Sequence, residues 1–181
     1  MAAEPRLESI SPDRWAGIFR TAERLVAHLE MRDAYAVDDP EFHDWKAGRI
    51  VDPSDREAWW LPWWHGSISA AVARGVHVRR ARIVSEPVSE YIRFEHAVTY
   101  TNIGAGEEVR WLPRRRVSGL ALPGNDFWLI DDRMVIFNHF TGSGESLGKE
   151  VTEAESVVRL CADAFTQAWE LAIPHEKYQP A

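Results

Sequence analysis

The chain has 181 residues, of which 45% are hydrophobic and 27% charged, and its formal net charge is −7 at pH 7. These values are typical of one soluble globular domain with its own core. The acidic balance argues against direct nucleic-acid binding, which needs a basic face. The single cysteine, Cys161, excludes an intramolecular disulfide and a cysteine-based metal site. The N-terminus has no apolar signal segment and no stretch approaches a membrane span, so we expect a cytoplasmic protein without a membrane partner.

The N-terminal third of the chain is expected to be mainly helical. We expect residues 1–10 to be disordered and residues 11–178 to form a single globular domain. Ser11 followed by Pro12 is typical of a helix start, and apolar residues at helical spacing continue to about residue 24. In the stretch RLVAHLEMRDAYAV, which ends at residue 37, the second half is expected to be extended.

Two further helical segments are expected before the middle of the chain. A short helix is expected over residues 40–48, closed by Gly48. A longer helix over residues 54–74 contains the stretch WWLPWWH, in which Pro62 should kink or divide it, and Gly75 ends it.

Strands dominate the second half of the chain. The stretch VHVRRARIV at 76–84 is rich in β-branched residues and is the clearest strand. A helix is expected from Pro87 to about residue 104. Strands follow over EVRWLP, DFWLIDD and RMVIFNHF, the last two forming a hairpin that turns near Asp131 and Asp132. TGSGESLG is expected to be a loop, and a final helix over 153–173 carries an apolar stripe that includes Cys161.

This order predicts an α/β (α+β) fold with a mixed central β-sheet. A strand–helix–strand crossover, a C-terminal hairpin and flanking helices follow the helical N-terminal third.

The helix expected after residue 87 carries a carboxylate on its packing face. On a helical wheel Glu95 lies among Tyr91, Ile92 and other apolar residues, and Asn102 follows further along. An unpaired buried carboxylate is costly, so Glu95 needs a cation, a donor or a cavity. Alternation in the preceding strand places Arg80 and Arg82 on one face with three valines, and we expect one of them to pair with Glu95. The pair could fix the helix register, or it could line a pocket with Tyr91 and Asn102; an exposed, slightly rotated helix is the third alternative.

A second polar group follows the ends of two strands. Arg114, Arg115 and Arg116 come after EVRWLP, and Ser85 and Glu86 come after VHVRRARIV. Ligands of open α/β sheets bind at such strand ends, so these residues could form an anion site; the alternative is a solvated loop. The candidate ligand-binding residues are therefore Arg80, Arg82, Glu86, Tyr91, Glu95, Asn102 and Arg114.

The sequence contains no recognisable catalytic or cofactor motif. The 7 histidines show no paired spacing, and no phosphate-binding loop or nucleophile motif is present, so we expect no metal site and no cofactor. Glu95 is the main candidate for acid/base catalysis, His139 with Asp131 across the hairpin is a less favoured one, and an enzyme is the less favoured class.

Several stretches together resemble a known protein family. RRARIVSEPVSEYIRFE, AGEEVRWLPR, DFWLIDDRMVIFNHF and AWELAIPHEKY resemble an uncharacterised family of small actinobacterial proteins, over nearly the whole chain from about residue 20. Members of that family are often encoded beside helix-turn-helix regulators of the xenobiotic-response type. The resemblance implies a regulatory or partner-binding role.

The strand order also resembles a phospholipase-D-type half-domain, whose catalytic pattern is His-x-Lys-x4-Asp. Counted back from Asp131, Gly124 stands at the histidine position and Asp126 at the lysine position. Counted back from Asp132, the two positions hold Asn125 and Phe127. The chemistry requires the histidine nucleophile, so this resemblance implies a degenerate, non-catalytic version.

We therefore expect a non-enzymatic regulatory accessory protein that binds a partner protein or a small ligand. A helix-turn-helix regulator and a second copy of the chain are the candidate protein partners. The alternative is an enzyme or sensor for a small anionic or nucleotide-like ligand, with a pocket around Glu95 and the arginines. A third class is an interaction protein that uses Trp59, Trp60, Trp63 and Trp64 as a contact surface.

Overall fold

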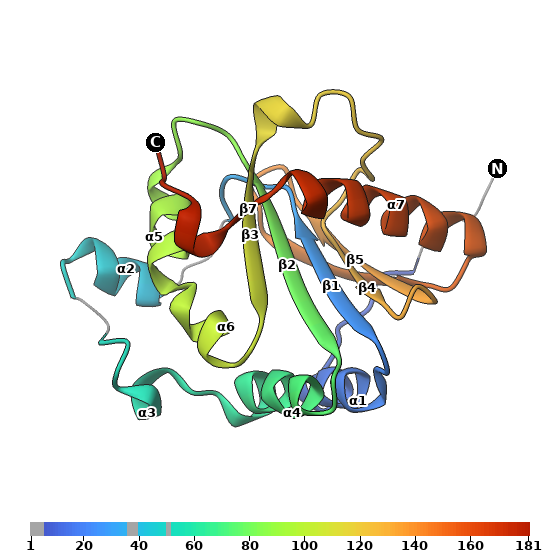
Figure 1. Ribbon diagram of the computed structural model, residues 1–181, viewed down its shortest axis with the longest axis horizontal. Helices are drawn as coiled ribbons and strands as arrows, with labels where there is room; N and C mark the ends of the chain where they lie inside the picture. Colours follow the sequence, from blue (N-terminus) through green and yellow to red (C-terminus); the bar gives the residue numbers. More distant parts are fainter. Residues whose placement is uncertain (1–5, 36–39, 50–51) are drawn as a thin grey trace.

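A mixed β-sheet forms the centre of the molecule (Figure 1). The computed structural model describes residues 6–35, 40–49 and 52–181. Within these residues the sheet has seven strands in the order β6–β5–β4–β1–β2–β3–β7. The strands are β1 (Leu25–Glu30), β2 (His77–Val84), β3 (Glu108–Pro113), β4 (Phe127–Ile130), β5 (Met134–Phe140), β6 (Ser146–Thr152) and β7 (Ile173–Pro174). β1, β2 and β3 are parallel and the other pairings are antiparallel, which confirms the expected mixed sheet.

Helices cover both faces of this sheet. They are α1 (Pro12–Thr21), α2 (Pro40–Lys46), α3 (Arg56–Trp59), α4 (Ser67–Ala73), α5 (Glu90–Val98), α6 (Tyr100–Gly104) and α7 (Glu155–Leu171). A π-helical turn, Pro62–Gly66, separates α3 from α4, so the expected long helix is divided at Pro62. Short 3-10 turns cover Arg114–Arg116 and His175–Lys177. α1 begins as expected, because the Ser11 side chain accepts a hydrogen bond from the Arg14 N–H and Pro12 is the first helical residue.

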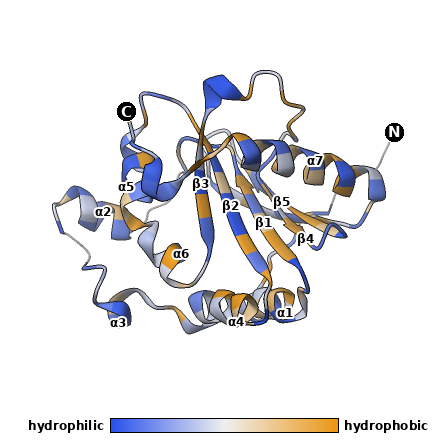
Figure 2. Cartoon of the chain, in the orientation of Figure 1, coloured by the Kyte–Doolittle hydropathy of each residue, from blue (hydrophilic) through white to orange (hydrophobic). Residues whose placement is uncertain are grey.

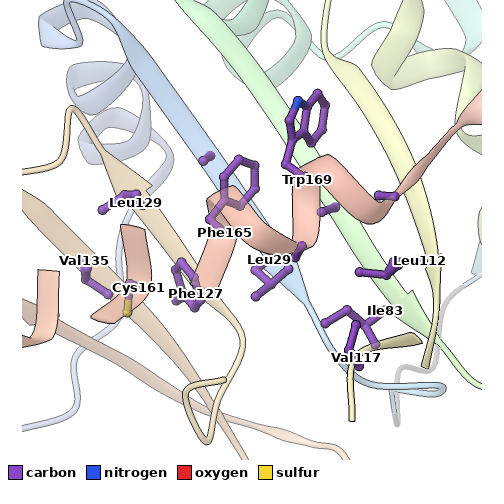
Figure 3. Packing of buried hydrophobic residues seen from close by; sticks show 14 of the residues in the cluster. Leu29, Ile83, Leu112, Val117, Phe127, Leu129, Val135, Cys161, Phe165 and Trp169 are labelled. Atoms are coloured by element: carbon purple, nitrogen blue, oxygen red, sulfur yellow. The ribbon is translucent and has the colours of Figure 1, made fainter. Parts of the chain in front are cut away.

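α7 covers one face of the sheet and forms the larger core. Alternation in β1 and β2 directs Leu29 and Ile83 toward this helix. Figure 3 shows Phe165 and Trp169 of α7 in the same cluster as these strand residues, and Cys161 of α7 beside Phe127 and Val135. Cys161 is fully buried, and burial raises the pKa of its thiol to about 12, so it behaves as a small core residue.

The opposite face is covered by two separate groups of elements. α1 and α4 pack at one end, where Trp15, Phe19 and Trp64 surround Trp128 of β4. α5 and the C-terminal segment pack at the other end around Trp111 and Tyr178. Between these two clusters the central strand β2 contains hydrophilic as well as hydrophobic residues (Figure 2).

The hairpin between β4 and β5 turns at Asp131 and Asp132, as expected. Both residues have positive φ, 51° and 54°, which Asp tolerates better than most side chains. The Asp131 carboxylate accepts hydrogen bonds from the backbone N–H groups of Glu23, Arg24 and Leu25 at 2.8–3.0 Å. These bonds tie the turn to the start of β1 and explain how Asp replaces the usual glycine.

Three local expectations were wrong. The first strand occupies the first half of RLVAHLEMRDAYAV and not the second half. The reason is that Val26 and Leu29 are buried on opposite faces of the sheet. Part of the second half lies outside the described residues. The expected loop at 141–148 contains the start of β6, which pairs with β5. The helix expected from Pro87 begins later, with Ser89 as its cap.

The N-terminal segment contacts the far edge of the sheet. Residues 1–5 of the segment expected to be disordered lie outside the described residues. Glu8 forms an isolated antiparallel bridge with Lys149 of β6, with N–H to carbonyl distances of 2.8 Å in both directions.

Candidate functional site

A row of charged side chains lies buried on the face of β1 and β2 that points away from α7. Alternation places His28 and Glu30 of β1 beside Arg80 and Arg82 of β2, with His28 paired to Arg80 and Glu30 to Arg82 in the parallel register. The side chains of Arg80 and Arg82 are only 8% and 7% exposed. We call this row, together with Glu95, Glu107 and Asn102, the buried charge network.

Arg82 lies between two carboxylates. Its Nη1 contacts Glu95 of α5, as expected, and its Nε lies 2.7 Å from Glu30 Oε2. Neither nitrogen is aligned for a hydrogen bond, so both contacts are ion pairs. The Tyr91 hydroxyl donates to the other Glu95 oxygen at 2.7 Å, and the Arg82 guanidinium lies 5.2 Å from the Trp111 ring centroid. The pair therefore anchors α5 to the sheet.

Arg80 anchors the next part of the same face. Its Nε donates to Glu107 Oε1 at 2.8 Å and its Nη1 contacts Glu30. Asn102 of α6 donates to the second Glu107 oxygen at 2.7 Å. Burial lowers the pKa of Arg80, but the charges of Glu107 and Glu30 outweigh this effect and hold the pKa above its ordinary value.

The charge balance of this network does not suit an anionic ligand. The two guanidinium groups face three carboxylates, those of Glu30, Glu95 and Glu107. His28 adds no charge near neutral pH, because burial and then the neighbouring Arg80 lower its pKa well below the ordinary value. The network thus carries one net negative charge, and each of its guanidinium groups is already paired with two carboxylates. We interpret it as a structural element that fixes α5 and α6 on the sheet.

A second group of polar residues lies where β1, β2 and β3 end. Arg114 follows β3, and its Nη2 donates to the carbonyl oxygens of Met31 and Ile83 at 2.5 and 3.1 Å. Its Nε donates to the Ser85 hydroxyl at 2.9 Å. The Asp33 carboxylate accepts from the Ser85 N–H and hydroxyl, both at 2.6 Å. Arg114 therefore joins the carboxyl ends of three adjacent parallel strands.

A cavity of about 380 Å³ opens at this edge. Part of its wall is formed by residues 122–126, at the end of the loop that joins β3 to β4 (Figure 1). Its walls combine basic, acidic and apolar groups, including Arg32, Arg114, Gly124, Asn125, Asp126 and Phe140. The Arg32 guanidinium lies 5.0 Å from the Phe140 ring centroid, and its Nε is buried without a hydrogen-bond partner. We call this the edge cavity.

Asp126 is the buried acid of the edge cavity. Its Oδ1 accepts from the Met31 N–H at 2.8 Å and its Oδ2 from the Tyr35 hydroxyl at 2.6 Å. Burial, reinforced by the charge of Glu30, raises the pKa of this carboxyl to about 6 despite both hydrogen bonds.

The structure divides the predicted site residues into two groups. Five of them lie in or against the buried charge network: Arg80, Arg82, Tyr91, Glu95 and Asn102. Arg114 lines the edge cavity and also a neighbouring hollow of about 340 Å³. Glu86 lines that hollow, where it contacts Arg115 and accepts from the Tyr178 hydroxyl at 3.1 Å.

Sequence reasoning missed several members of both groups. Glu30 and His28 were overlooked because the first strand was assigned too late in the chain. The alternation of Val26, His28 and Glu30 would have revealed them. Arg32 and Tyr35 carry no local sequence signal, because only the tertiary fold brings them to Asp126.

The four clustered tryptophans serve mainly packing. Trp64 packs in the core against Phe19 and Trp128, and Trp59 and Trp60 are half-buried. Trp63 is exposed to 42%, and the nearby Leu61 is exposed to 48%. Only this small part of the segment is available as a contact surface.

No group of three or more metal-ligating side chains occurs in the part of the chain that the structure describes. No helix in those residues has the length and apolar character needed to cross a bilayer.

The fold of this chain is similar to the folds of several solved structures. Nuc from Salmonella typhimurium, a phospholipase D family member, superposes with a TM-score of 0.50 at 13% identity, covering 94% of this chain and 98% of that chain. The chain therefore has a phospholipase-D-like fold. TrmBL2, an archaeal chromatin protein, gives a TM-score of 0.48 at 13% identity over 96% of this chain and 55% of that one. NucT from Helicobacter pylori gives 0.47 at 12% identity over 90% and 89%.

The family is defined by the sequence. Residues 13–180 match the family described as a domain of unknown function, DUF6879, and the chain belongs to this family. Comparison with curated proteins finds no match.

Proposed function

We propose that the chain is a non-enzymatic regulatory module whose edge cavity binds a small anionic ligand. The observation that carries the proposal is the half-buried Arg32 guanidinium in the cavity wall, whose buried Nε has no hydrogen-bond partner among the residues that the structure describes. A buried donor without an acceptor is costly, and an anion oxygen would satisfy it. The cavity also lies at the carboxyl ends of parallel strands, where ligands of α/β sheets commonly bind.

The lining residues support binding rather than catalysis. Counted back from Asp131, Gly124 and Asp126 stand where the phospholipase-D pattern has histidine and lysine, and both line the edge cavity. Glycine offers no nucleophile, and a carboxyl group cannot supply the positive charge of lysine. The lining of the edge cavity in this register thus lacks the groups that the reaction requires.

The test compares two arginine substitutions that change the net charge equally. Arg32→Gln removes the guanidinium from the edge cavity, whereas Arg159→Gln removes one from the exposed surface of α7, where it pairs with Glu155. Inorganic sulfate and phosphate are titrated by calorimetry at fixed ionic strength. A charge-assisted hydrogen bond contributes about 1.5–3 kcal/mol, so Arg32→Gln should weaken binding roughly tenfold or more. Equal affinity in both variants, or no binding by the parent chain, would overturn the proposal.

A protein partner is the second candidate, and the exposure of Leu61 and Trp63 favours it. Adjacent exposed apolar side chains of this size commonly anchor interfaces. Native mass spectrometry of the protein purified gently from its own host tests this candidate. A co-purifying helix-turn-helix regulator, lost in Trp63→Ser, would support it. A bare chain, or a partner retained by Trp63→Ser, would exclude this surface.

A further inference from the structure

We propose that the edge cavity takes up its anion together with one proton, which Asp126 holds. This inference rests on the proposed function, because it concerns the same cavity and the same ligand. It adds a specific chemistry: the binding of the anion is coupled to the binding of one proton. The proton is held by the protein and not by the ligand.

The first argument is geometric. Asp126 is 2% exposed and lines the same cavity as Arg32 and Arg114. Its carboxyl lies near enough to Arg32 for the guanidinium charge to lower the carboxyl pKa. An anion bound to Arg32 in this cavity therefore lies close to a buried carboxylate that is ionised. Like charges at short range in such surroundings repel strongly, and protonation of the carboxyl removes the repulsion.

The second argument is that the proton is available near neutral pH. Burial has already raised the pKa of Asp126 to about 6, so the carboxyl of the empty site is mostly ionised at pH 7. A bound anion adds a further negative charge beside it and shifts the pKa upward again. Binding at pH 7 then draws a proton from solvent.

The surroundings of Asp126 set the size of this effect. Its two oxygens accept from the Met31 N–H and the Tyr35 hydroxyl, and both bonds favour the ionised form. The charged groups that face it from the packed elements are Glu30 of β1, Arg32 beyond β1, Lys149 of β6 and Arg114 beyond β3. Asn138 of β5 donates its backbone N–H to the Asp126 carbonyl at 2.8 Å and adds no charge.

Sulfate is the appropriate probe because it stays fully ionised between pH 5 and 8, so any proton taken up is held by the protein. Calorimetric titrations at pH 7 in Bis-Tris and in Tris, two cationic buffers that do not compete for the site, give the number of protons bound per sulfate. We expect between about one half and one proton for the parent chain and none for Asp126→Asn. Affinity for sulfate should rise by at most about tenfold per pH unit between pH 8 and 6.

A second variant guards against loss of the fold in Asp126→Asn. Tyr35→Phe keeps the carboxyl but removes a hydrogen bond that holds its pKa down, so the midpoint of the affinity profile should move to higher pH. Sulfate binding without proton uptake in the parent, or an unchanged midpoint in Tyr35→Phe, overturns the inference and leaves the proposed function standing. Absence of sulfate binding at every pH overturns both.

Discussion

The exposure of individual side chains indicates that the buried charge network, and not the edge cavity, has a structural role. The buried charge network joins β1, β2, α5 and the segment before β3 through carboxylates that differ in exposure. The Glu107 side chain is 0% exposed, whereas Glu95 is 19% exposed. Each carboxylate neutralises an arginine that has little access to water.

Neutral substitutions of these two carboxylates should therefore cost different amounts of stability. Glu107→Gln leaves Arg80 with Glu30 alone and should lower the free energy of unfolding by about 3–5 kcal/mol, the usual cost of breaking a buried pair. Glu95→Gln keeps the Tyr91 partner and some contact with water, so we expect about 1–2 kcal/mol. Urea unfolding monitored by tryptophan fluorescence measures both. A larger loss for Glu95→Gln than for Glu107→Gln would contradict this interpretation.

Asp126 makes stability depend on pH in the opposite sense from an ordinary ion-paired carboxylate. Its folded-state pKa of about 6 lies above the unfolded value of 3.8. The protonated carboxyl therefore contributes stability that is present below about pH 4 and is lost as the pH rises through about 6. The difference corresponds to roughly 3 kcal/mol.

The stability of the parent relative to Asp126→Asn should thus fall by roughly 2 kcal/mol between pH 4 and pH 7, which is most of the full difference. Subtracting the variant's profile from the parent's removes the contributions of all other groups. Chemical unfolding at several pH values provides both profiles. A flat difference, or one that rises with pH, would show that Asp126 is not a buried acid of raised pKa.

At the scale of elements, sequence patterns located most helices and strands but few of the contacts between them. The wheel of α5 and the alternation of β2 were enough to predict that Glu95 pairs with Arg80 or Arg82, because both patterns are local; the structure selects Arg82. The start of β6 was missed because Gly142 and Gly144 suggest a loop, and only pairing with β5 makes residues 146–152 a strand. Glu107 could not be predicted, because it lies between α6 and β3 without any periodic pattern.

The packing of α3 on α6 depends on a glycine that no periodicity identifies. A Cβ at Gly104 would lie 2.8 Å from the Trp59 ring, whereas a Cβ at Gly66 would lie 3.9 Å from its nearest atom, in the Trp60 ring. Both glycines are in helical segments with ordinary φ, so alanine is compatible with both backbones.

Gly104→Ala should therefore be less stable than Gly66→Ala by about 2 kcal/mol, because overpacking costs about 1–3 kcal/mol while both variants gain helix propensity. Thermal unfolding compares the two variants, and near-ultraviolet circular dichroism reports the displacement of Trp59. Equal stability of both variants would mean that the Trp59 ring does not pack against α6.

On the scale of the whole molecule, the chain combines a phospholipase-D-like fold with a different set of polar groups. The positive charge available to a ligand lies at the strand ends, while the arginines in the middle of the sheet are neutralised by buried carboxylates. The resemblance seen in the sequence correctly indicated the fold and the family, because strand order and several long motifs carry it. The edge cavity was not predictable, since residues 31–35, 114 and 122–126 meet only in the folded chain.

The central claim is that a small anion binds at the strand ends and not at the buried charge network. The most direct measurement is a titration of the labelled protein with sodium sulfate, followed by backbone amide NMR with sodium chloride as the ionic-strength control. We expect the largest sulfate-specific shift changes at residues 124–126 and at Met31, and their loss in Arg32→Gln. Shift changes centred on Glu95 and Arg82, or no changes beyond those caused by chloride, would contradict the claim.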